Sequence, residues 1–541
     1  MPSSVRVLPP GVGPSEHSQF FDELAKIVGG ENISRDASAG ALTGPHQQNS
    51  YGDPYSLVDQ DQHTPSGAVR PASVEEVQQV LRLANRFKVP LWTVSRGRNL
   101  GYGGSAPVVA GSVVLDLHRM NRVLEVSGKD AYAIVEPGVS FFDLYEEIKR
   151  RDLPLWPSTA AIGWGSVLGN TLDHGFGYTP GGVHTDMQCG MEVVLPTGDL
   201  VRTGMGAMTD SKLFPLYKAG FGPSLDGLFY QSNLGVVTKL GIHISPAPEA
   251  YTACDLSVPN EEDLPQFIEL LADLQRRGVI TNHPSVSNVF RQAILSPDPA
   301  CTEKMAPYFG PNKRVPDSVL DELKSTYGWG FWRAEFGIQG DADVVLALES
   351  SLRRAITKIP GARLEVRKFG GTPGRFLRGE EVETPGIPHN GVPTLTAMTL
   401  MDYRMAPGSG HGDFAPILPT SGPALLEWWL EAKKMVAEAN LDLFADFHVW
   451  SRYIIPIVMV VYAPEEKDRV KTLVQNLIND AARRGLTTYR THVEYMDQIR
   501  SHFSFNDHAH AKLVDSFKAT LDPNDILSPG KSGIKGTVRK S

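Results

Sequence analysis

A glycine-rich segment that contains a tyrosine is the first group of residues in this chain whose types and spacing could do chemistry. It reads SRGRNLGYGGSAP over residues 95–107 and follows a short apolar run at 91–94. Glycine adopts positive φ angles and has no Cβ, so backbone N–H groups in such a loop can converge on an anion. Tyr102 would then lie close to whatever the loop holds. A tight turn between strands is the alternative that the loop alone leaves open.

Further segments along the chain give this loop a context. They are GSVVLDL at 111–117, MNRVLEV at 120–126, VEPGV at 135–139, GSVLGN at 165–170, GYTP at 177–180, EVVLP at 192–196, RTGMGA at 202–207, FGP at 221–223, QSNLGVVTK at 231–239, YRTH at 489–492, LDPN at 521–524 and PGKSG at 529–533. In this order and spacing, they resemble the vanillyl-alcohol oxidase / 4-cresol dehydrogenase family of flavoproteins. The resemblance covers most of the chain and is weak at 1–50 and in much of 250–400. No Gly-x-Gly-x-x-Gly opens a helix after a strand, so a nicotinamide site has no support.

The resemblance implies FAD as the cofactor and assigns residues to it. These are Arg98, Asn99, Gly101, Gly103, Gly104, Ser166, Gly169, Asn170, Gly235, Val236 and Lys531. For Lys531, a surface lysine after a turn is an equal alternative. The family links FAD covalently through a residue in a Gly-x-His-x-x-Phe-x-Pro context, which His411 matches in its Phe and Pro offsets. Imidazole is a nucleophile near neutral pH, so we expect an 8α-histidyl link rather than a plain loop histidine.

A substrate site also carries over from the family, residue by residue. Tyr102, Tyr489 and Arg490 match the residues that bind a phenolate there. Two tyrosine hydroxyls that donate to a phenol oxygen, beside an always-charged guanidinium, lower the pKa of the phenol. An ionised para-alkylphenol releases hydride from its benzylic carbon more readily, because the product is a neutral p-quinone methide. Taken alone, Tyr489 and Arg490 would suit a surface tyrosine beside an ion-paired arginine.

One position departs from the family pattern. Where the family usually carries Pro-Asp-Leu beside the flavin, with the aspartate as acid/base, this chain reads AAI at 160–162. An alanine cannot deprotonate water. We expect Asp446 to take over this role, because strand alternation places it on one face with Phe444 and His448. The alternative is an acid at a strand end in solvent or in an ion pair. Asp173 is the second choice for the acid.

Composition excludes several classes of partner. Fifty-two Lys and Arg against 61 Asp and Glu give a net charge of −9, which argues against nucleic acid. Three cysteines are too few for a disulfide framework, and the 15 histidines form no metal-like cluster. No apolar run approaches the roughly 20 residues that cross a bilayer. The start of the chain lacks a secretion-signal pattern and the end lacks a peroxisomal tripeptide. We expect an intracellular, cytoplasmic protein, with a peroxisomal one left open.

The elements that must position these residues alternate between helices and strands without an internal repeat. The apolar spacing predicts helices at 73–88, 140–151, 261–277, 342–357 and 422–440, and strands at 91–94, 112–117, 131–136, 443–449 and 454–462. A hairpin is predicted around residues 197–198 and a linker at 246–248. We expect an α+β fold, with an FAD-binding domain at 1–248, an α+β cap (substrate) domain at 249–492, and a segment at 493–541 that the resemblance returns to the first domain.

The predicted function is therefore FAD-dependent oxidation of para-substituted phenols, either 4-alkylphenols or 4-hydroxybenzylic alcohols. The resemblance implies hydride transfer to the flavin through a p-quinone methide, with O2 as the acceptor and H2O2 as a product. Tyr102, Tyr489 and Arg490 would activate the phenol, and Asp446 would act as base. The substrate pocket is assigned to Ala161, His448 and Asp413. Two alternatives stay open: a dehydrogenase that passes electrons to a cytochrome, and a flavin-binding protein with little turnover. The resemblance also implies a homodimer or a higher homo-oligomer.

Overall fold

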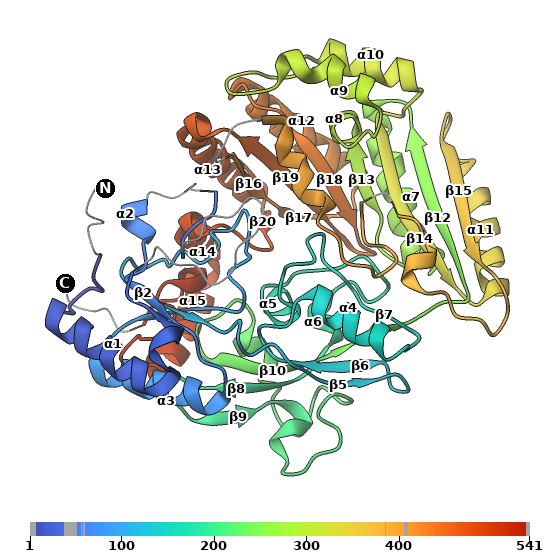
Figure 1. The fold of residues 1–541 in the computed structure, drawn as a ribbon. Coiled ribbons are helices and arrows are strands. Elements are labelled where there is room, and N and C mark those ends of the chain that lie inside the picture. Colours follow the sequence, from blue (N-terminus) through green and yellow to red (C-terminus); the bar gives the residue numbers. More distant parts are fainter. Residues whose placement is uncertain are drawn as a thin grey trace.

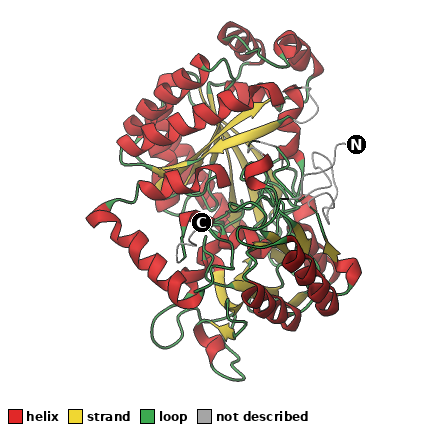
Figure 2. Ribbon diagram, turned by 90° about the vertical axis from the view of Figure 1, so that its left-hand side faces the viewer, coloured by secondary structure: helices red, strands yellow, loops and turns green. Residues whose placement is uncertain are grey.

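The fold is built on three main β-sheets with helices packed around them (Figure 1). The computed structural model describes residues 7–36, 51–55, 57, 60–384, 386–404 and 409–536. Two smaller sheets form one half of the molecule, and a large sheet flanked by helices forms the other. Figure 2 shows the same two halves from the side. Within the described residues, every helix is too short or too polar to cross a membrane.

The first sheet is small and mostly parallel. Its order is β1 (Ile33–Ser34), β2 (Gly67–Val69), β4 (Val113–Asp116) and β3 (Leu91–Val94), with β1 antiparallel to β2. Helices α1 (Pro14–Val28) and α3 (Val74–Phe87) pack against each other beside it, and α2 (Gln60–His63) precedes β2. α3 begins where the Ser73 side chain accepts a hydrogen bond from the Glu76 N–H, which caps the helix. The apolar stripe of α3 is buried in the core of this sheet.

The second sheet is antiparallel, and several of the segments that resemble the flavoprotein family lie in its strands. Its order is β5 (Val123–Ser127), β6 (Tyr132–Val135), β10 (Val236–His243), β8 (Gln188–Val194) and β9 (Leu200–Arg202). Helix α4 (Phe141–Arg150) packs its apolar side into this core, and the short helices α5 (Val167–Leu172) and α6 (His184–Met187) follow. β7 (Leu155–Trp156) pairs with β11 (Ser245–Pro246) in a two-stranded sheet.

The third sheet is the largest and spans the other half of the molecule. Its order is β15 (Arg363–Gly370), β12 (Ala250–Val258), β14 (Trp332–Gly340), β13 (Ser285–Asn288), β18 (Phe444–Val449), β19 (Tyr453–Tyr462), β17 (Pro416–Pro419) and β20 (Thr487–Thr488), with β16 (Gly410–Phe414) also paired to β19. The helices of this half are α7 (Leu264–Arg276), α8 (Val289–Ile294), α9 (Pro299–Met305), α10 (Asp317–Tyr327), α11 (Ala342–Ile356), α12 (Gly422–Glu438) and α13 (Lys467–Arg483). Together they bury the most extensive apolar core of the chain.

The last part of the chain crosses back to the first sheet. Helices α14 (Met496–Ser501) and α15 (Phe505–Leu521) lie in the half that holds the two smaller sheets (Figure 1). Beyond them, the Leu91 N–H donates to the Ile526 carbonyl at 2.7 Å, and the Ser528 N–H donates to the Leu91 carbonyl at 2.7 Å. Residues 526–528 therefore extend the edge of the first sheet next to β3, although more than 400 residues separate them along the chain.

The elements predicted from apolar spacing are confirmed. The five predicted helices correspond to α3, α4, α7, α11 and α12, and the predicted strands to β3, β4, β6, β18 and β19. β8 and β9 form the predicted hairpin, with Gly198 at φ 85° in its turn. The linker predicted at 246–248 is partly wrong, because its first residue belongs to β11. A proline fits there because it lies on the edge of a two-stranded sheet, where its missing N–H costs no ladder hydrogen bond.

A buried ion pair connects α15 to the half of the molecule that holds the two smaller sheets. The Lys518 side chain is 0% exposed, and its Nζ lies 2.5 Å from Asp522 Oδ2. The same ammonium donates to the carbonyl oxygens of Leu527, at 2.7 Å, and Asn233, at 3.2 Å. Asp522 in turn accepts hydrogen bonds from the backbone N–H groups of residues 526 and 527. One buried cation thus connects the last helix, the segment that leads into β10 and the returning segment.

Replacing this cation should destabilise the protein strongly. Lys518→Met leaves the Asp522 carboxylate buried without its counter-charge, which costs about 3–5 kcal/mol. The free energy of unfolding from a urea titration of the FAD-loaded protein measures this loss. Lys512→Met, on the same helix, removes an ion pair with Asp507 whose partners are 64% and 84% exposed, and should change stability by less than about 0.5 kcal/mol. Equal unfolding midpoints for the two variants would contradict the role of Lys518.

Candidate active site

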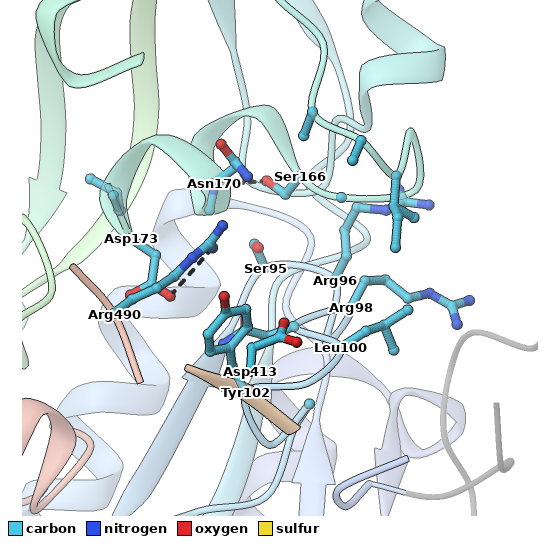
Figure 3. A pocket seen from close by; sticks show the side chains of 18 of the residues that line it. Ser95, Arg96, Arg98, Leu100, Tyr102, Ser166, Asn170, Asp173, Asp413 and Arg490 are labelled. Carbon is cyan, nitrogen blue, oxygen red and sulfur yellow. Dashed lines mark hydrogen bonds and ion pairs between the residues drawn. The ribbon is translucent and has the colours of Figure 1, made fainter. Parts of the chain in front are cut away.

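One cavity of about 410 Å³ lies between the two halves of the molecule and takes its walls from all three sheets. Residues 92–100 of β3 and the following glycine-rich loop form one wall. Residues 160–173 and 231–237 form another, beside the second sheet. The third wall comes from the large sheet, with Asp446 and His448 of β18 and His411 and Asp413 of β16. Figure 3 shows side chains from these segments pointing toward the same space.

The glycine-rich loop presents backbone and guanidinium groups to this cavity. Four of its glycines have positive φ angles, between 56° and 101°. The Arg96 side chain donates to the carbonyl oxygens of Trp164, at 3.0 Å, and Gly138, at 2.6 Å. The Arg98 guanidinium lies over the Trp164 ring, 5.0 Å from its centroid. Burial, with the charge of Arg96, lowers the pKa of Arg98 to about 10, so Arg98 is still a cation near pH 7.

A cluster of two tyrosines and an arginine also lines the cavity. Arg490 Nε donates to the Tyr489 hydroxyl at 2.9 Å. The Arg490 guanidinium also lies 4.7 Å from the centre of the Tyr102 ring and 5.1 Å from that of Tyr489. Tyr489 and Arg490 follow β20 in the large sheet, whereas Tyr102 comes from the glycine-rich loop. Burial raises the pKa of Tyr102 well above its usual range, so its hydroxyl keeps its proton and can donate it.

Two further charges lie behind this cluster. Asp173 directly follows α5, and its Oδ2 lies 4.0 Å from Arg490 Nη1 (Figure 3). Its Oδ1 lies 3.3 Å from Lys531 Nζ. Burial alone would raise the pKa of Asp173, but Lys531 and Arg490 lower it below the usual value. Burial alone would lower the pKa of Arg490, but Tyr489, Tyr102 and Asp173 raise it. The three charged groups together retain one net positive charge at the cavity wall.

His411 and Asp413 form a second pair, on β16. Alternate residues of a strand share a face, and here both side chains face the cavity. His411 Nδ1 lies 2.8 Å from Asp413 Oδ1, and the Tyr55 ring lies 4.9 Å from the imidazole, centre to centre. Gly101 supports the pair from behind: a Cβ there would lie 2.4 Å from His411 Cε1, and φ is 78°. Only a glycine fits this position without displacing the histidine.

Asp446 lies in the cavity wall and is also part of an ion pair. Its Oδ2 lies 3.1 Å from Arg291 Nη2 of α8 and 3.7 Å from His448 Nε2. The Ser285 hydroxyl donates to Oδ1. Burial would raise the pKa of Asp446, but Arg291, His448 and Ser285 lower it below the usual range. The carboxylate therefore lines the cavity, as expected, and is also ion-paired, as in the alternative; its role as a base stays a prediction. Phe444 does not line the cavity and packs against Phe290 instead.

Most of the predicted site residues meet at this one cavity. Its lining includes Tyr102, Tyr489, Arg490, Asp446, His411, Arg98, Asn99, Gly104, Ser166, Gly169, Asn170, Gly235, Val236, Lys531, Ala161, His448 and Asp413. Gly101 and Gly103 do not line it; Gly101 lies behind the His411–Asp413 pair, and a Cβ on Gly103 would lie 2.8 Å from Val493 Cγ2. Sequence reasoning missed Arg291, because no motif or spacing distinguishes it within its short helix.

Comparisons with known proteins agree on the family. Residues 65–204 match the model of an FAD binding domain, and 399–532 that of the C-terminal domain of FAD linked oxidases. The flavoprotein subunit of 4-cresol dehydrogenase [hydroxylating] from Pseudomonas putida is 32% identical over 535 residues, 98% of both chains. The chain belongs to the vanillyl-alcohol oxidase / 4-cresol dehydrogenase family. It is an FAD-dependent oxidoreductase.

Two solved structures of this family are similar over nearly the whole chain. One is a 4-ethylphenol oxidase from Gulosibacter chungangensis in complex with isoeugenol, with 33% identity and a TM-score of 0.88 over 98% of this chain and 99% of that one. The other is p-cresol methylhydroxylase with substrate bound, with 30% identity and a TM-score of 0.86 over the same shares. The α+β fold with an FAD-binding domain is thereby confirmed.

The residues around the cavity fit a bound FAD. A Cβ on Gly169 would lie 2.3 Å from Ser95 Oγ, so α5 approaches the glycine-rich loop closely because this residue has no side chain. Asn233 lines the cavity, and its buried Oδ1 has no hydrogen-bond partner among the described residues. The glycine-rich loop and the guanidiniums of Arg96 and Arg98 suit a pyrophosphate, and an unpaired amide oxygen suits a polar heterocycle.

Proposed function

We propose that this protein oxidises para-substituted phenols, either 4-alkylphenols or 4-hydroxybenzylic alcohols, through a p-quinone methide, with O2 as electron acceptor and H2O2 as product. The observation that carries the proposal is the buried Arg490 with the hydroxyls of Tyr102 and Tyr489 beside the cavity. Relatives named for 4-cresol and 4-ethylphenol support the class of substrate, and the one named an oxidase supports O2. The domain boundaries at 248 and 492 remain part of this proposal.

The tyrosine–arginine cluster activates the phenol by stabilising its anion. Tyr102 keeps its proton because burial raises its pKa, so it donates a hydrogen bond to the phenol oxygen and does not compete for the negative charge. Arg490 stays charged at every working pH. Because Asp173 is shared between Arg490 and Lys531, one positive charge is left for the phenolate to neutralise. An ionised substrate then has the electron density that drives hydride from the benzylic carbon.

Asp446 serves the step in which water adds to the quinone methide. When bound, FAD supplies the acceptor for the hydride that leaves the substrate. Ala161 has no ionisable group, so the wall that it forms cannot activate water. Asp446 is ionised and accepts a hydrogen bond from water on the other side, although the neighbouring Arg291 makes it a weak base. Asp173 is less suited, because Lys531 and Arg490 already hold its carboxylate.

His411 would hold the bound flavin covalently, through a link to its 8α-methyl carbon. Its partner Asp413 accepts the Nδ1 proton, at 2.8 Å, which fixes the tautomer and leaves Nε2 with the lone pair needed for attack. Gly101 and Tyr55 hold the ring in place from the side of the glycine-rich loop. The attachment therefore depends on a preset imidazole orientation as well as on the presence of a histidine.

Anaerobic reduction of the flavin tests the phenol proposal. 4-Ethylphenol should bleach the yellow colour of the wild-type protein, and Arg490→Met should slow this step about 100-fold or more, because the charge that stabilises the phenolate is lost. The FAD content of Arg490→Met should stay near that of the wild type. The surface variant Arg452→Met should reduce at the wild-type rate. Equal rates for Arg490→Met and the wild type would place the phenol oxygen elsewhere.

Reoxidation of the reduced flavin, followed in the same apparatus, identifies the electron acceptor. On mixing the reduced protein with air, rapid reoxidation with one H2O2 for each flavin supports the oxidase. Slow reoxidation in air together with fast reoxidation by an added cytochrome c would replace it with the dehydrogenase. A panel of 4-alkylphenols that leaves the flavin yellow would instead favour a flavin-binding protein with little turnover.

Acid precipitation tests the covalent link. The wild-type pellet should stay yellow, and that of His411→Ala should be colourless with FAD in the supernatant. Gly101→Ala should also lose most of its bound colour, because the new Cβ would displace the imidazole. Gly222→Ala is the control: φ is 94° there as well, but a Cβ would meet nothing within 4 Å. A colourless wild-type pellet would overturn the link and leave FAD binding untouched.

A further inference from the structure

We propose that the cavity has a second polar subsite, formed by Arg291 and His448, which binds a hydroxyl group at the end of the substrate's para side chain. The preferred substrates would then be 4-(hydroxyalkyl)phenols rather than plain 4-alkylphenols. This inference rests on the proposed phenol oxidation, because it takes the phenol oxygen to be held by Arg490.

The Phe176 ring lines the cavity next to both of its polar ends. Its centre lies 6.1 Å from that of the Tyr489 ring and 4.6 Å from that of the His448 ring. A phenol held at Tyr489 would therefore extend its para substituent along Phe176 toward His448. Ile457 and Met459 of β19 add apolar side chains to the wall. The space suits an alkyl chain of a few carbons that ends in a polar group.

The far end offers both a hydrogen-bond donor and an acceptor. Among the described residues, the Arg291 guanidinium has one ion-pair partner, Asp446, although it carries five N–H donors and lines the cavity. His448 is almost fully buried, and its Nδ1 has no hydrogen-bond partner within the described part of the chain. Because Asp446 lies nearest to Nε2, the ring proton is favoured there, which leaves Nδ1 as an acceptor. Arg291 can thus donate to a ligand oxygen that in turn donates to His448.

A hydroxyl matches this arrangement better than other groups. It donates and accepts at once, and it satisfies a buried nitrogen that is otherwise left without a partner. The charges of Arg291 and Asp446 cancel, and Glu335, behind them, is shifted toward its neutral form because burial raises its pKa. Burial also lowers the pKa of the neighbouring His389 to about 3, so its imidazole is neutral. A carboxylate on the substrate would be repelled by Asp446, and an ammonium would be repelled by Arg291. A methyl group would leave His448 Nδ1 without a hydrogen-bond partner.

Matched substrates test the subsite on the FAD-loaded enzyme. 4-(3-Hydroxypropyl)phenol and 4-butylphenol have side chains of equal length, so they differ in the terminal hydroxyl alone. Stopped-flow anaerobic reduction gives an apparent Kd for each. We expect the alcohol to bind about tenfold more tightly than the alkylphenol, although it is less hydrophobic. 3-(4-Hydroxyphenyl)propanoate should bind more weakly than the alcohol. Equal Kd values, or tighter binding of 4-butylphenol, would overturn the subsite.

Variants identify the residue responsible. His448→Phe keeps an aromatic ring but removes the acceptor, so the ratio of the two Kd values should fall to about one. His448→Gln restores a polar side chain and should recover part of the ratio. Thr396→Val removes a hydroxyl elsewhere in the same cavity and should keep the wild-type ratio. A ratio unchanged in His448→Phe would also overturn the assignment. If neither phenol reduces the flavin, the proposed function has failed, which is a distinct outcome.

Discussion

The buried guanidinium of Arg490 is the charge around which this site is arranged. A cation without solvent is costly unless other groups compensate it, and here Tyr489, Tyr102 and Asp173 do so. These partners come from the large sheet, the glycine-rich loop and the end of α5. The site is therefore complete only when all three sheets meet. The returning C-terminal segment forms the edge of the first sheet and also contributes Lys531, the counter-ion of Asp173. The same segment therefore supports the fold and the charge balance of the site.

The second constraint is the placement of the carboxylates. Ala161 leaves one wall of the cavity without an ionisable group, whereas Asp446 brings a charge to the large sheet together with its counter-ion Arg291. Burying this aspartate without Arg291 would cost several kcal/mol, so the two residues form one unit. Asp413 is committed to His411 in the same way, and Asp173 to Lys531. Each carboxylate thus has a cationic or imidazole partner, and these pairings favour different roles for the three acids.

Much of the fold and of the site was predictable from the sequence, for physical reasons that also explain the gaps. α3 and α4 carry caps and apolar stripes that act within one helix, so local pattern was enough. β12, β14 and β15 were not predicted, since their pairing joins residues up to about 120 positions apart and leaves little local signal. The glycine-rich loop lines the cavity, as predicted. Gly101 and Gly103 do not line it, because the backbone turns away from the cavity at these two glycines, and this depends on φ angles that the sequence does not show. The role of Arg291 could not be predicted, because it depends on an ion pair with Asp446, which lies more than 150 residues later in the chain.

If Arg490 and its tyrosines hold the phenol as its anion, a titration of the bound phenol will show it. A para-substituted phenol without a benzylic hydrogen, such as 4-tert-butylphenol, binds without being oxidised. Its ultraviolet difference spectrum against pH then reports its ionisation in the site. A cation within about 4–6 Å should lower the pKa of the bound phenol by about 1 to 3 units, so the phenolate band should appear at a lower pH than in solution. A bound phenol that titrates at or above its solution pKa would show that Arg490 does not stabilise the phenolate.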